Sequence, residues 1–352
     1  MLSAILRQYD LSEFEAQPLV SGLINRTWKV TAPSGMFILQ RVNDQVFREP
    51  WKLADNLHQL DQFLKDQHPD YLFVAPLPNR EGKDMVYMEG DGYYRLMPYV
   101  HGSHTISVVA SPQQAFEAAF QFGRFAQLLS AYDASKLNLT IPDFHNLTLR
   151  YEQFERAIAQ GDAERIGNSR ELIDELRKRQ GIVHKFADIR NSSEARIRVM
   201  HLDTKISNIL FDRDNKGMCV IDLDTVMPGY FISDVGDMMR TYLSPASEEV
   251  KEMNQIEVRE DFFRAIVQGY IAAMRDELTP YEKELFCYSG FFLIYMQALR
   301  FLADHLNRDI YYGASYEGHN YFRALNQVTL LKRFEEKLPV LEEIVKEECN
   351  MS

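Results

Sequence analysis

The sequence contains few cysteines and no long apolar run. Cys219, Cys287 and Cys349 are odd in number and far apart, which argues against a disulfide framework or a cysteine metal site and suits reduced packing residues in a cytosol. The longest apolar run, residues 291–299, is far too short to span a bilayer, and the first residues do not form a basic segment followed by an apolar one. We therefore expect a cytoplasmic protein with no membrane partner.

Basic residues are also in deficit. The 39 Lys and Arg residues face 51 Asp and Glu residues among 352, giving a formal net charge of -12. Nucleic-acid binding depends on clustered Lys and Arg, so we expect no nucleic-acid partner. A small phosphorylated ligand remains compatible with this charge, because a few basic groups and a metal ion can be focused locally. The composition does not indicate an oligomeric state.

The first hundred residues show the periodicity of strands with one helix among them. Alternation over 27–31 and the β-rich residues 37–39, separated by a Pro-Ser-Gly turn, predict a hairpin over 27–41. A helix is predicted over 51–64, because its leucines recur at spacings of four, three and four. Two further strands are predicted near 85–88 and 93–97, around a Gly-containing turn.

The remaining residues are mainly helical in pattern. A helix over 112–130 is predicted after Ser111, an N-cap followed by proline at the first helical position. A charged helix pair over 150–188, broken near 161–169, and a helical tail from Val258 are also expected, with short strands and loops over 199–221. We therefore predict an α+β fold of two lobes, a β-rich nucleotide-binding lobe (1–97) and a larger helical catalytic and substrate-binding lobe (98–352), with a ligand cleft between them.

One segment carries a recognisable pattern of chemistry. His201 to Asn208 reads HLDTKISN, or H-x-D-x-x-x-x-N, and a later apolar strand ends in Asp222. Phosphoryl transfer needs a carboxylate that orients the acceptor hydroxyl, together with hard oxygen ligands for Mg²⁺. Asp203 fits the first requirement, and Asn208 with Asp222 fits the second. An alternative for each residue alone is an ordinary loop residue that caps a turn.

With these residues the sequence resembles the aminoglycoside phosphotransferase and choline kinase superfamily, which shares the protein-kinase fold. Within this superfamily it resembles the N-acetylhexosamine 1-kinases most. The resemblance covers about residue 21 to the end and rests on HLDTKISNIL, VIDLDTVMPG, DVGDMMR and RFLADHL. It implies ATP and Mg²⁺ as cofactors, Asp203 as catalytic base and Asn208 and Asp222 as Mg²⁺ ligands. It also implies an amino sugar acceptor bound by the C-terminal lobe near Asp203, Thr225, Arg300 and the Tyr311-Tyr312 pair.

Two positions depart from the usual kinase pattern. Asp222-Leu223-Asp224 stands where protein kinases have Asp-Phe-Gly, so Asp224 either supports the metal or substrate site or is a surface loop residue. The phosphate-gripping Lys of the third strand is absent, and Arg41, or less favourably Gln40, takes its place. The usual helical Glu partner is also missing, and Asn56 stands there, with an exposed polar residue as the alternative.

The loop expected to cover the nucleotide matches the usual glycine-rich pattern only weakly. Residues 20–27 contain one glycine, and we expect backbone N–H groups with Asn25 and Thr27 to cover the phosphates, unless this is an ordinary hairpin turn. Adenine is expected to bind backbone groups of the lobe connection, at Met97 and Tyr99.

Acceptor identity stays open in the sequence. Arg300 lies among apolar helical residues and needs a partner, either the sugar or Asp304 one turn later. A kinase of another small alcohol, such as choline, homoserine or an aminoglycoside, is the first alternative. A pseudokinase that only binds nucleotide is the second.

Overall fold

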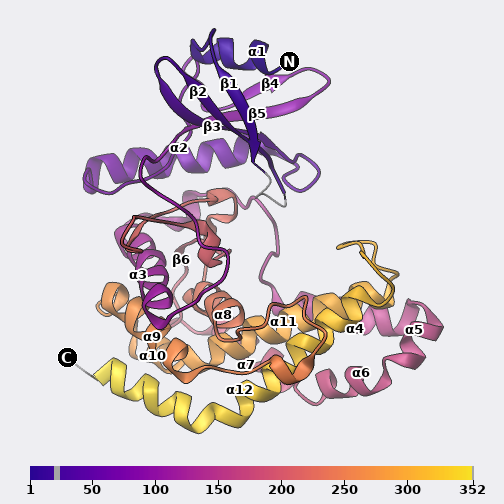
Figure 1. Ribbon diagram of the computed structural model, residues 1–352. Coiled ribbons are helices and arrows are strands. Elements are labelled where there is room, and N and C mark those ends of the chain that lie inside the picture. Colours follow the sequence, from indigo (N-terminus) through magenta and orange to yellow (C-terminus); the bar gives the residue numbers. More distant parts are fainter. Residues whose placement is uncertain (20–23, 351–352) are drawn as a thin grey trace.

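The computed structural model describes residues 1–19 and 24–350, and it consists of two lobes of unequal size (Figure 1). The smaller N-terminal lobe contains an antiparallel sheet with the strand order β1-β2-β3-β5-β4. Its elements are α1 (Leu2–Leu6), a 3-10 turn (Arg7–Tyr9), β1 (Glu15–Leu19), β2 (Arg26–Ala32), β3 (Gly35–Val42), α2 (Pro50–Gln67), β4 (Val86–Met88) and β5 (Gly92–Pro98). The predicted hairpin, helix and strand pair are therefore confirmed, and α1 and β1 were not predicted.

The two faces of this sheet pack against different partners. On one face, Leu39, Tyr94 and Leu96 are buried with Ile5 and Leu6 of α1. Because successive strand residues point to opposite faces, Gln40 and its cross-strand partner Arg95 lie on the other face, which the next subsection shows to meet the larger lobe.

Helix α2 buries the leucine stripe that its sequence predicts. Leu53, Leu57, Leu60 and Leu64 are each at most 2% exposed. Asn56 is only 1% exposed, so its interpretation as a surface residue is wrong: its amide donates to the carbonyl of Asn138 (2.9 Å) and accepts from the Asn138 N–H (2.8 Å). This helix therefore anchors a segment of the larger lobe.

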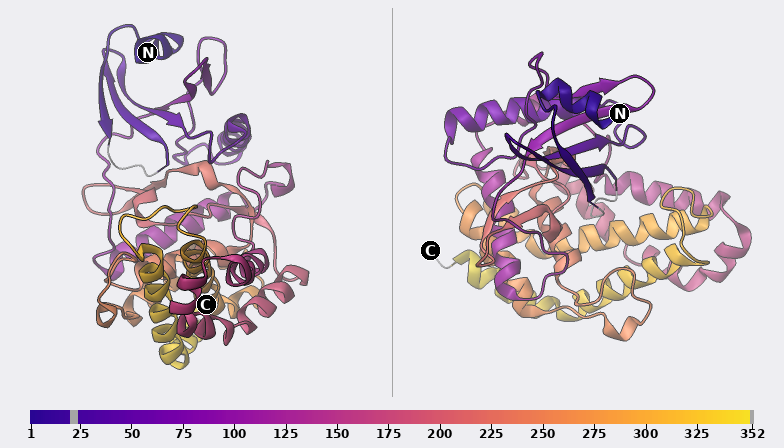
Figure 2. Two further views of the ribbon diagram at one scale, coloured as in Figure 1. Left: turned by 90° about the vertical axis from the view of Figure 1, so that its right-hand side faces the viewer. Right: turned by 45° about the horizontal axis from the view of Figure 1, so that its top comes forward.

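The C-terminal lobe is mainly helical and lies below the sheet in Figures 1 and 2. Four helices replace the predicted pair over 150–188, because Gly161 ends the first of them and short helices follow it. The helices are α3 (Pro112–Leu128), α4 (Leu147–Gln160), α5 (Ala163–Asn168), α6 (Arg170–Arg177), α7 (Gly181–Asn191), α8 (Phe231–Tyr242), α9 (Glu260–Met274), α10 (Pro280–Glu284), α11 (Phe286–Leu306) and α12 (His319–Asn350), with 3-10 turns at Ala134–Lys136, Ile206–Asn208, Leu223–Thr225 and Met253–Gln255.

Helix α11 forms the centre of this lobe, packing on α12, α8 and α4. Among the described residues it is the one helix whose length and composition would allow it to cross a membrane, and 78% of its apolar window is buried inside the protein, as in the core helix of a globular domain. The Ser111 cap of α3 is confirmed, since its side chain accepts from the Gln114 N–H.

Two short hairpin-like pairs lie on the side of this lobe that faces the sheet. Strand β6 (Arg198–Met200) pairs with β9 (Met227–Gly229), and β7 (Ile209–Phe211) pairs with β8 (Gly217–Val220). The segments between these strands carry the HLDTKISN motif and Asp222, so the strand pairing brings the two parts of the motif together.

Candidate active site

The loop of residues 201–208 follows β6, and helix α8 fixes its backbone. The Asp234 carboxylate accepts from the N–H groups of His201 (3.1 Å) and Leu202 (2.8 Å), and Asp237 accepts from the Thr204 N–H (2.9 Å). Leu202 has a left-handed φ of 65°, a conformation that costs energy for a branched residue and persists only where the surroundings impose it. Helix α8 therefore sets the course of the loop into Asp203.

His201 braces the loop from inside the core. Its Nε2 lies 2.9 Å from the carbonyl oxygen of Ile221, and the Asp203 N–H points to its Nδ1 at 3.3 Å. This pattern fits a neutral imidazole that donates at Nε2 and accepts at Nδ1. The ring is fully buried and packs edge-on against Phe122, so His201 links the motif loop to the segment that carries Asp222.

Asp203 lies at the open side of this loop, where its carboxylate meets two polar groups. Lys205 Nζ is 2.9 Å from Oδ1, and the Asn208 amide donates to Oδ2 at 3.1 Å and to the Asp203 carbonyl at 2.8 Å. Burial acts to raise the pKa of Asp203, but the charge and hydrogen bond of Lys205, with the hydrogen bond of Asn208, lower it below the usual value. The side chain is therefore an ionised carboxylate at neutral pH, suited to accept a hydrogen bond from an acceptor hydroxyl.

Asp222 stands beside Asn208 because of the β7-β8 pairing. The Ile221 N–H donates to the Asn208 carbonyl (2.8 Å), and Asp222 follows with a left-handed φ of 57°. Its carboxylate reaches solvent, yet partial desolvation by the surrounding protein and the charges of Asp224 and Asp203 raise its pKa to about 7. A carboxylate made unstable by neighbouring negative charge is where a divalent cation would be stabilising.

The donor set fits the magnesium ion that the motif implies. Asn208 uses its amide nitrogen as a donor to Asp203, which leaves its oxygen for a cation, and Asp222 supplies a carboxylate. These are the hard oxygen ligands that Mg²⁺ prefers, and few protein ligands are needed because the ion usually keeps waters and substrate oxygens. Within residues 1–19 and 24–350 no cluster of three His, Cys, Asp or Glu side chains offers a competing metal site.

Asp224 is a buried link between the lobes and not a surface residue. Its carboxylate lies 2.5 Å from the guanidinium of Arg95 on β5 and accepts from the Asn25 amide (2.7 Å) at the start of β2. Both charged side chains are at most 3% exposed. Asn25 in turn accepts from the Asn43 N–H (3.0 Å), so the residue predicted to cover phosphates is held in this interlobe contact.

Arg41 does not lie on the interlobe face, which corrects the expectation that it replaces the phosphate-gripping lysine. Its Nε donates to the carbonyl of Asp91 (2.7 Å), on the face of the sheet that carries Tyr94. Gln40 takes the inward position, and its amide oxygen accepts from Nε (3.0 Å) and a terminal nitrogen (2.7 Å) of Arg95. Arg95 is therefore the cation that Gln40 contacts on the interlobe face.

The other residues expected to bind nucleotide lie in different surroundings. Thr27 accepts from the Gln40 amide at 3.4 Å, so it belongs to the interlobe face, whereas residues 20–23 of the predicted covering loop lie outside the described residues. The Tyr99 N–H donates to the carbonyl of Met36 (3.3 Å), so it is already engaged within the sheet, and Met97 pairs with Ile38 in β5.

The residues expected to bind the acceptor lie in two places, one against the motif loop and the others at the wall of a cavity. Thr225 donates to the carbonyl of His201 (2.6 Å), so it supports the loop. Arg300 is not paired with Asp304, contrary to the sequence alternative, because Asp304 accepts from the N–H groups of Tyr311 (2.8 Å) and Tyr312 (2.9 Å). The Arg300 guanidinium instead lies 5.8 and 5.4 Å from the ring centres of these tyrosines.

Sequence reasoning missed three residues of this site. Lys205 had a usable signal, since it stands two positions after Asp203 within the motif itself. Arg95 and His145 had none, because only the fold brings Arg95 to Asp224 and places His145 within the electrostatic influence of both Asp203 and Arg300.

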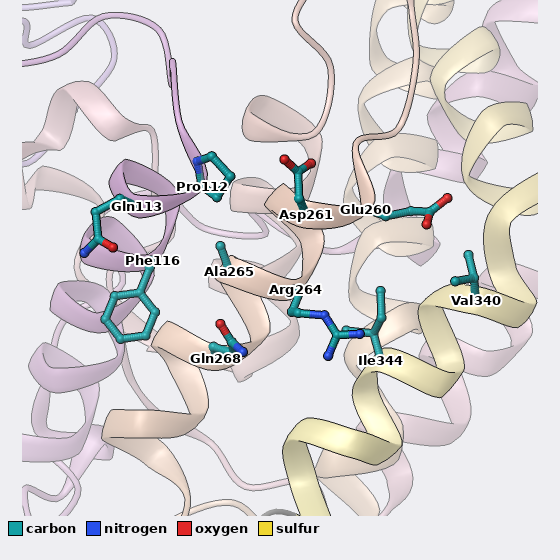
Figure 3. Close-up of a pocket in the computed structure, with 10 residues that line it drawn as sticks. All are labelled: Pro112, Gln113, Phe116, Glu260, Asp261, Arg264, Ala265, Gln268, Val340 and Ile344. Carbon is teal, nitrogen blue, oxygen red and sulfur yellow. The ribbon is translucent and has the colours of Figure 1, made fainter.

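The cavities of the protein differ in whether they adjoin these acceptor residues, and Tyr311 lines two of them. A cavity of about 340 Å³ is lined by Arg300, Tyr311 and Tyr312 together with residues of α4. A larger hollow of about 680 Å³ lies between α3, α9 and α12 (Figure 3), and its lining includes none of the motif residues. Size alone therefore does not locate the reaction site.

Comparison with known proteins agrees with this geometry. Residues 15–280 match the family described as the phosphotransferase enzyme family. The fold is shared with an aminoglycoside phosphotransferase from Alicyclobacillus acidocaldarius (13% identity, TM-score 0.66, covering 98% of this chain and 96% of that one). It is also shared with spectinomycin phosphotransferase in complex with ADP and spectinomycin (12%, 0.60, 95% and 98%) and choline kinase from Cryptosporidium parvum (12%, 0.59, 99% and 98%).

These likenesses confirm the predicted kinase-like fold, with its small antiparallel sheet and helical C-terminal region. At such low identity the solved structures bear on the fold alone. The family match is broader evidence of kinship, because it spans residues 15–280 of 352 and includes the whole of the HLDTKISN motif and Asp222. The chain accordingly belongs to the phosphotransferase enzyme family.

Proposed function

We propose that this small-molecule phosphotransferase transfers the γ-phosphoryl group of ATP to the anomeric hydroxyl of an N-acetylhexosamine, with Mg²⁺ as the metal. The observation that carries the proposal is the construction of the 201–208 loop. Asp234, Asp237 and His201 fix its backbone, and the Asp203 carboxylate at its open side stays ionised beside Lys205. Such preorganisation suits a reaction in which the protein mainly positions groups and stabilises charge.

Each residue of the site has a role in this proposal. Asp203 accepts the hydrogen bond of the acceptor hydroxyl and takes its proton as the new P–O bond forms and the bond from the γ-phosphorus to the bridging oxygen breaks, releasing ADP. Lys205 lies close enough to Asp203 to bind the phosphoryl oxygens that face the acceptor. Asn208 and Asp222 would hold Mg²⁺, which neutralises phosphate charge when it is bound.

The acceptor side of the site supports a sugar over a cationic alcohol. Arg300 and Tyr311 supply the hydrogen-bond donors and aromatic wall that sugar binding uses, and Phe144 lies 6.0 Å from the same guanidinium. A quaternary ammonium or aminoglycoside would have to bind beside Arg300 and Arg150, which line one cavity and repel a cation. The intact set of Asp203, Asn208 and Asp222 also argues against a pseudokinase.

An acceptor screen tests the proposal. ADP release should be measured with N-acetylglucosamine, N-acetylgalactosamine, glucose, choline, ethanolamine and homoserine, with and without excess EDTA. We expect turnover of an N-acetylhexosamine, abolished by EDTA, and a product that carries phosphate at the anomeric oxygen by ³¹P NMR. Release of ADP only with choline or ethanolamine would refute the sugar assignment, and full activity in EDTA would refute the metal.

A further inference from the structure

The cavity beside the acceptor residues is unusually cationic for a protein of net charge -12. It lies between α4 and α11, which Figure 1 shows below the sheet, and the loop after α11 closes it. Its volume is about 340 Å³, the size of a site for a small molecule. Its charged and aromatic lining consists of Arg150, Arg156, Arg300, Asp304, Tyr311 and Tyr312.

Arg300 contributes a guanidinium that is held in place but not neutralised. It is partly buried, and one terminal nitrogen donates to the Gln297 amide oxygen (3.2 Å), while the same amide donates to the Tyr312 hydroxyl (3.2 Å). No carboxylate among the described residues forms an ion pair with it. The aromatic rings and Gln297 therefore orient Arg300 and leave its positive charge for a ligand.

Arg150 repeats this arrangement from the opposite wall. Its terminal nitrogens donate to the carbonyls of Asp143 (2.8 Å) and Phe144 (3.2 Å) and to Gln153 (3.0 Å). Its Nε is buried and has no hydrogen-bond partner. Burial, followed by the charge of Arg300, lowers the pKa of Arg150, so two like charges are held near one another at a cost that a bound anion would offset.

The one carboxylate in the cavity lining cannot supply that compensation. Asp304 is 5% exposed and accepts from the N–H groups of Tyr311 and Tyr312 and from the Asn320 amide (3.2 Å). Its carboxylate is directed towards the loop after α11, and its hydrogen bonds hold Tyr311 and Tyr312 at the cavity wall. Arg156 adds a third, exposed guanidinium at the rim, which no described carboxylate pairs.

His145 follows Phe144, whose carbonyl accepts from Arg150 and whose ring lies 6.0 Å from the Arg300 guanidinium. The charges of both Arg300 and Asp203 act on this imidazole, and its ring stacks on Phe144, 4.4 Å between centres. An acceptor that reaches both sites would extend from Asp203 past His145 towards Arg300 and Arg150.

From this arrangement we propose that the physiological acceptor carries a non-reacting anionic group, a carboxylate, sulfate or phosphate, bound by Arg150 and Arg300. The inference rests on the proposed phosphotransfer to a small-molecule hydroxyl and narrows its substrate class. Guanidinium groups bind such anions through charge-assisted, often bidentate hydrogen bonds. The binding free energy of one such hydrogen bond is large enough to decide between two acceptors that are otherwise equal.

Matched acceptors that differ only in the anion test the inference. The pairs are N-acetylglucosamine and its 6-sulfate, glucose and glucuronate, and ethanolamine and serine. We expect kcat/KM for the anionic member of at least one pair to exceed that of the neutral or cationic member by about 10- to 100-fold. The difference should lie mainly in KM, because the anion is bound before and during the transfer.

Variants separate recognition from folding. Arg300→Gln and Arg150→Gln should bring this ratio close to one, whereas Arg300→Lys should retain part of it. Arg170→Gln, at an exposed position of α6 outside the cavity, is the charge-matched control and should leave the ratio unchanged. Melting temperatures measured beside the kinetics identify any variant that fails through instability.

Calorimetric binding of the same pairs, in the presence of a non-transferable ATP analogue and Mg²⁺, keeps the two proposals distinguishable. If an anionic member binds more tightly and Arg300→Gln abolishes the difference, the anion site is supported whether or not ADP is released. A lack of ADP release with every acceptor would overturn the proposed reaction and not the anion site. Equal or tighter binding of the neutral member in every pair, or a ratio that survives both glutamine variants, overturns the anion site.

Discussion

Single residues show where the chemistry of this site is concentrated. Asp203 is the acidic side chain whose position is fixed by the loop backbone, by Lys205 and by Asn208 at once. The motif spacing predicted this residue and its two oxygen-donor companions, because the whole set lies within a short stretch of sequence and one hairpin. What the spacing could not show is that Lys205 keeps the carboxylate ionised.

Replacement of Asp203 tests its role. Asp203→Asn keeps the side-chain shape but removes the proton acceptor, so kcat should fall by about 10²- to 10⁴-fold while the Kd for ATP changes less than threefold. Steady-state kinetics and nucleotide binding by calorimetry measure the two quantities. An equal loss of nucleotide affinity would show that Asp203 acts on ATP and not on the acceptor.

The neighbouring pair Gln40 and Arg41 gives a second prediction at this scale. Gln40 binds Arg95 on the interlobe face, whereas Arg41 binds Asp91 on the opposite face. Gln40→Ala should therefore raise KM for ATP about tenfold, since it releases two hydrogen bonds of a cation near the nucleotide side. Arg41→Ala should leave KM for ATP within a factor of two. The reverse result would mean that Arg41 turns inward when ATP binds.

The sequence predicted β3 but favoured Arg41 over Gln40 at the position that faces the cleft, and the structure places Gln40 there. Strand periodicity fixes only that adjacent side chains point to opposite faces. The choice is made by Arg95 on β5 and by Asp224, more than a hundred residues later, which meet at the interlobe face. No local pattern contains that information.

Helices with a clear stripe of apolar residues or a clear N-cap were the easiest elements to predict. The leucines of α2 and the Ser-Pro start of α3 are local signals, and both helices form as expected. The region of α4 to α7 was predicted as two helices because charged, short helices have few apolar positions to define their ends. Helix α8 is different, since its buried Asp234 and Asp237 serve the 201–208 loop and make sense only in the folded protein.

Close packing of α8 on α11 yields a prediction at the scale of elements. A Cβ added at Gly236 would lie 2.2 Å from the carbonyl oxygen of Ser289, a backbone atom that cannot move aside cheaply. Gly236→Ala should therefore lower the free energy of unfolding by about 2 kcal/mol or more. It should also lower kcat, because Asp234 on the same helix holds the loop.

The control for this variant is another helical glycine. Gly167 in α5 has no atom within 4 Å of an added Cβ, so Gly167→Ala should be neutral or stabilising by up to ~1 kcal/mol. Urea denaturation followed by circular dichroism compares the two. Equal stability of both variants would contradict the tight contact between α8 and α11.

The whole molecule is held in its two-lobed arrangement by polar contacts as well as by α2. Arg95 and Asn25 of the sheet lobe converge on Asp224, so the turn that follows Asp222 is tied to both lobes. The charge of Asp224 also raises the pKa of Asp222. The lobe contact and the acidity of the site are therefore coupled, a property that belongs to neither lobe alone.

At the scale of the whole molecule, we predict that the stability of the protein depends on pH through His145. Burial, with the positive charges of Arg300, Arg150 and Arg240, lowers the pKa of His145 from 6.5 to about 3, and Asp203 only partly opposes this. Its Nδ1 is buried without a hydrogen-bond partner, which agrees with a neutral ring. The folded protein therefore keeps His145 neutral where the unfolded chain binds a proton.

The sign follows from this difference. A lowered folded-state pKa contributes stability that is present above pH 6.5 and is lost as the pH falls towards 3. The raised pKa values of Asp222, about 7, and Asp234, about 6, act in the opposite direction, so the wild-type profile alone cannot isolate His145. A comparison with His145→Gln isolates the contribution of His145. The glutamine amide does not titrate, and the contributions of the two aspartates to the pH dependence are the same in both proteins.

We expect the stability of the wild type relative to His145→Gln to fall by about 1 kcal/mol between pH 7 and pH 5, roughly half of what full burial would give, since the side chain is only partly shielded from solvent. Urea denaturation at each pH measures the difference. His184→Gln, at an exposed position of α7, is the matched control, and the stability difference between the wild type and this variant should not change with pH in the same way. A constant difference between the wild type and His145→Gln would mean that the pKa of the imidazole is the same in the folded protein as in the unfolded chain, and burial would then not keep the ring neutral below pH 6.5.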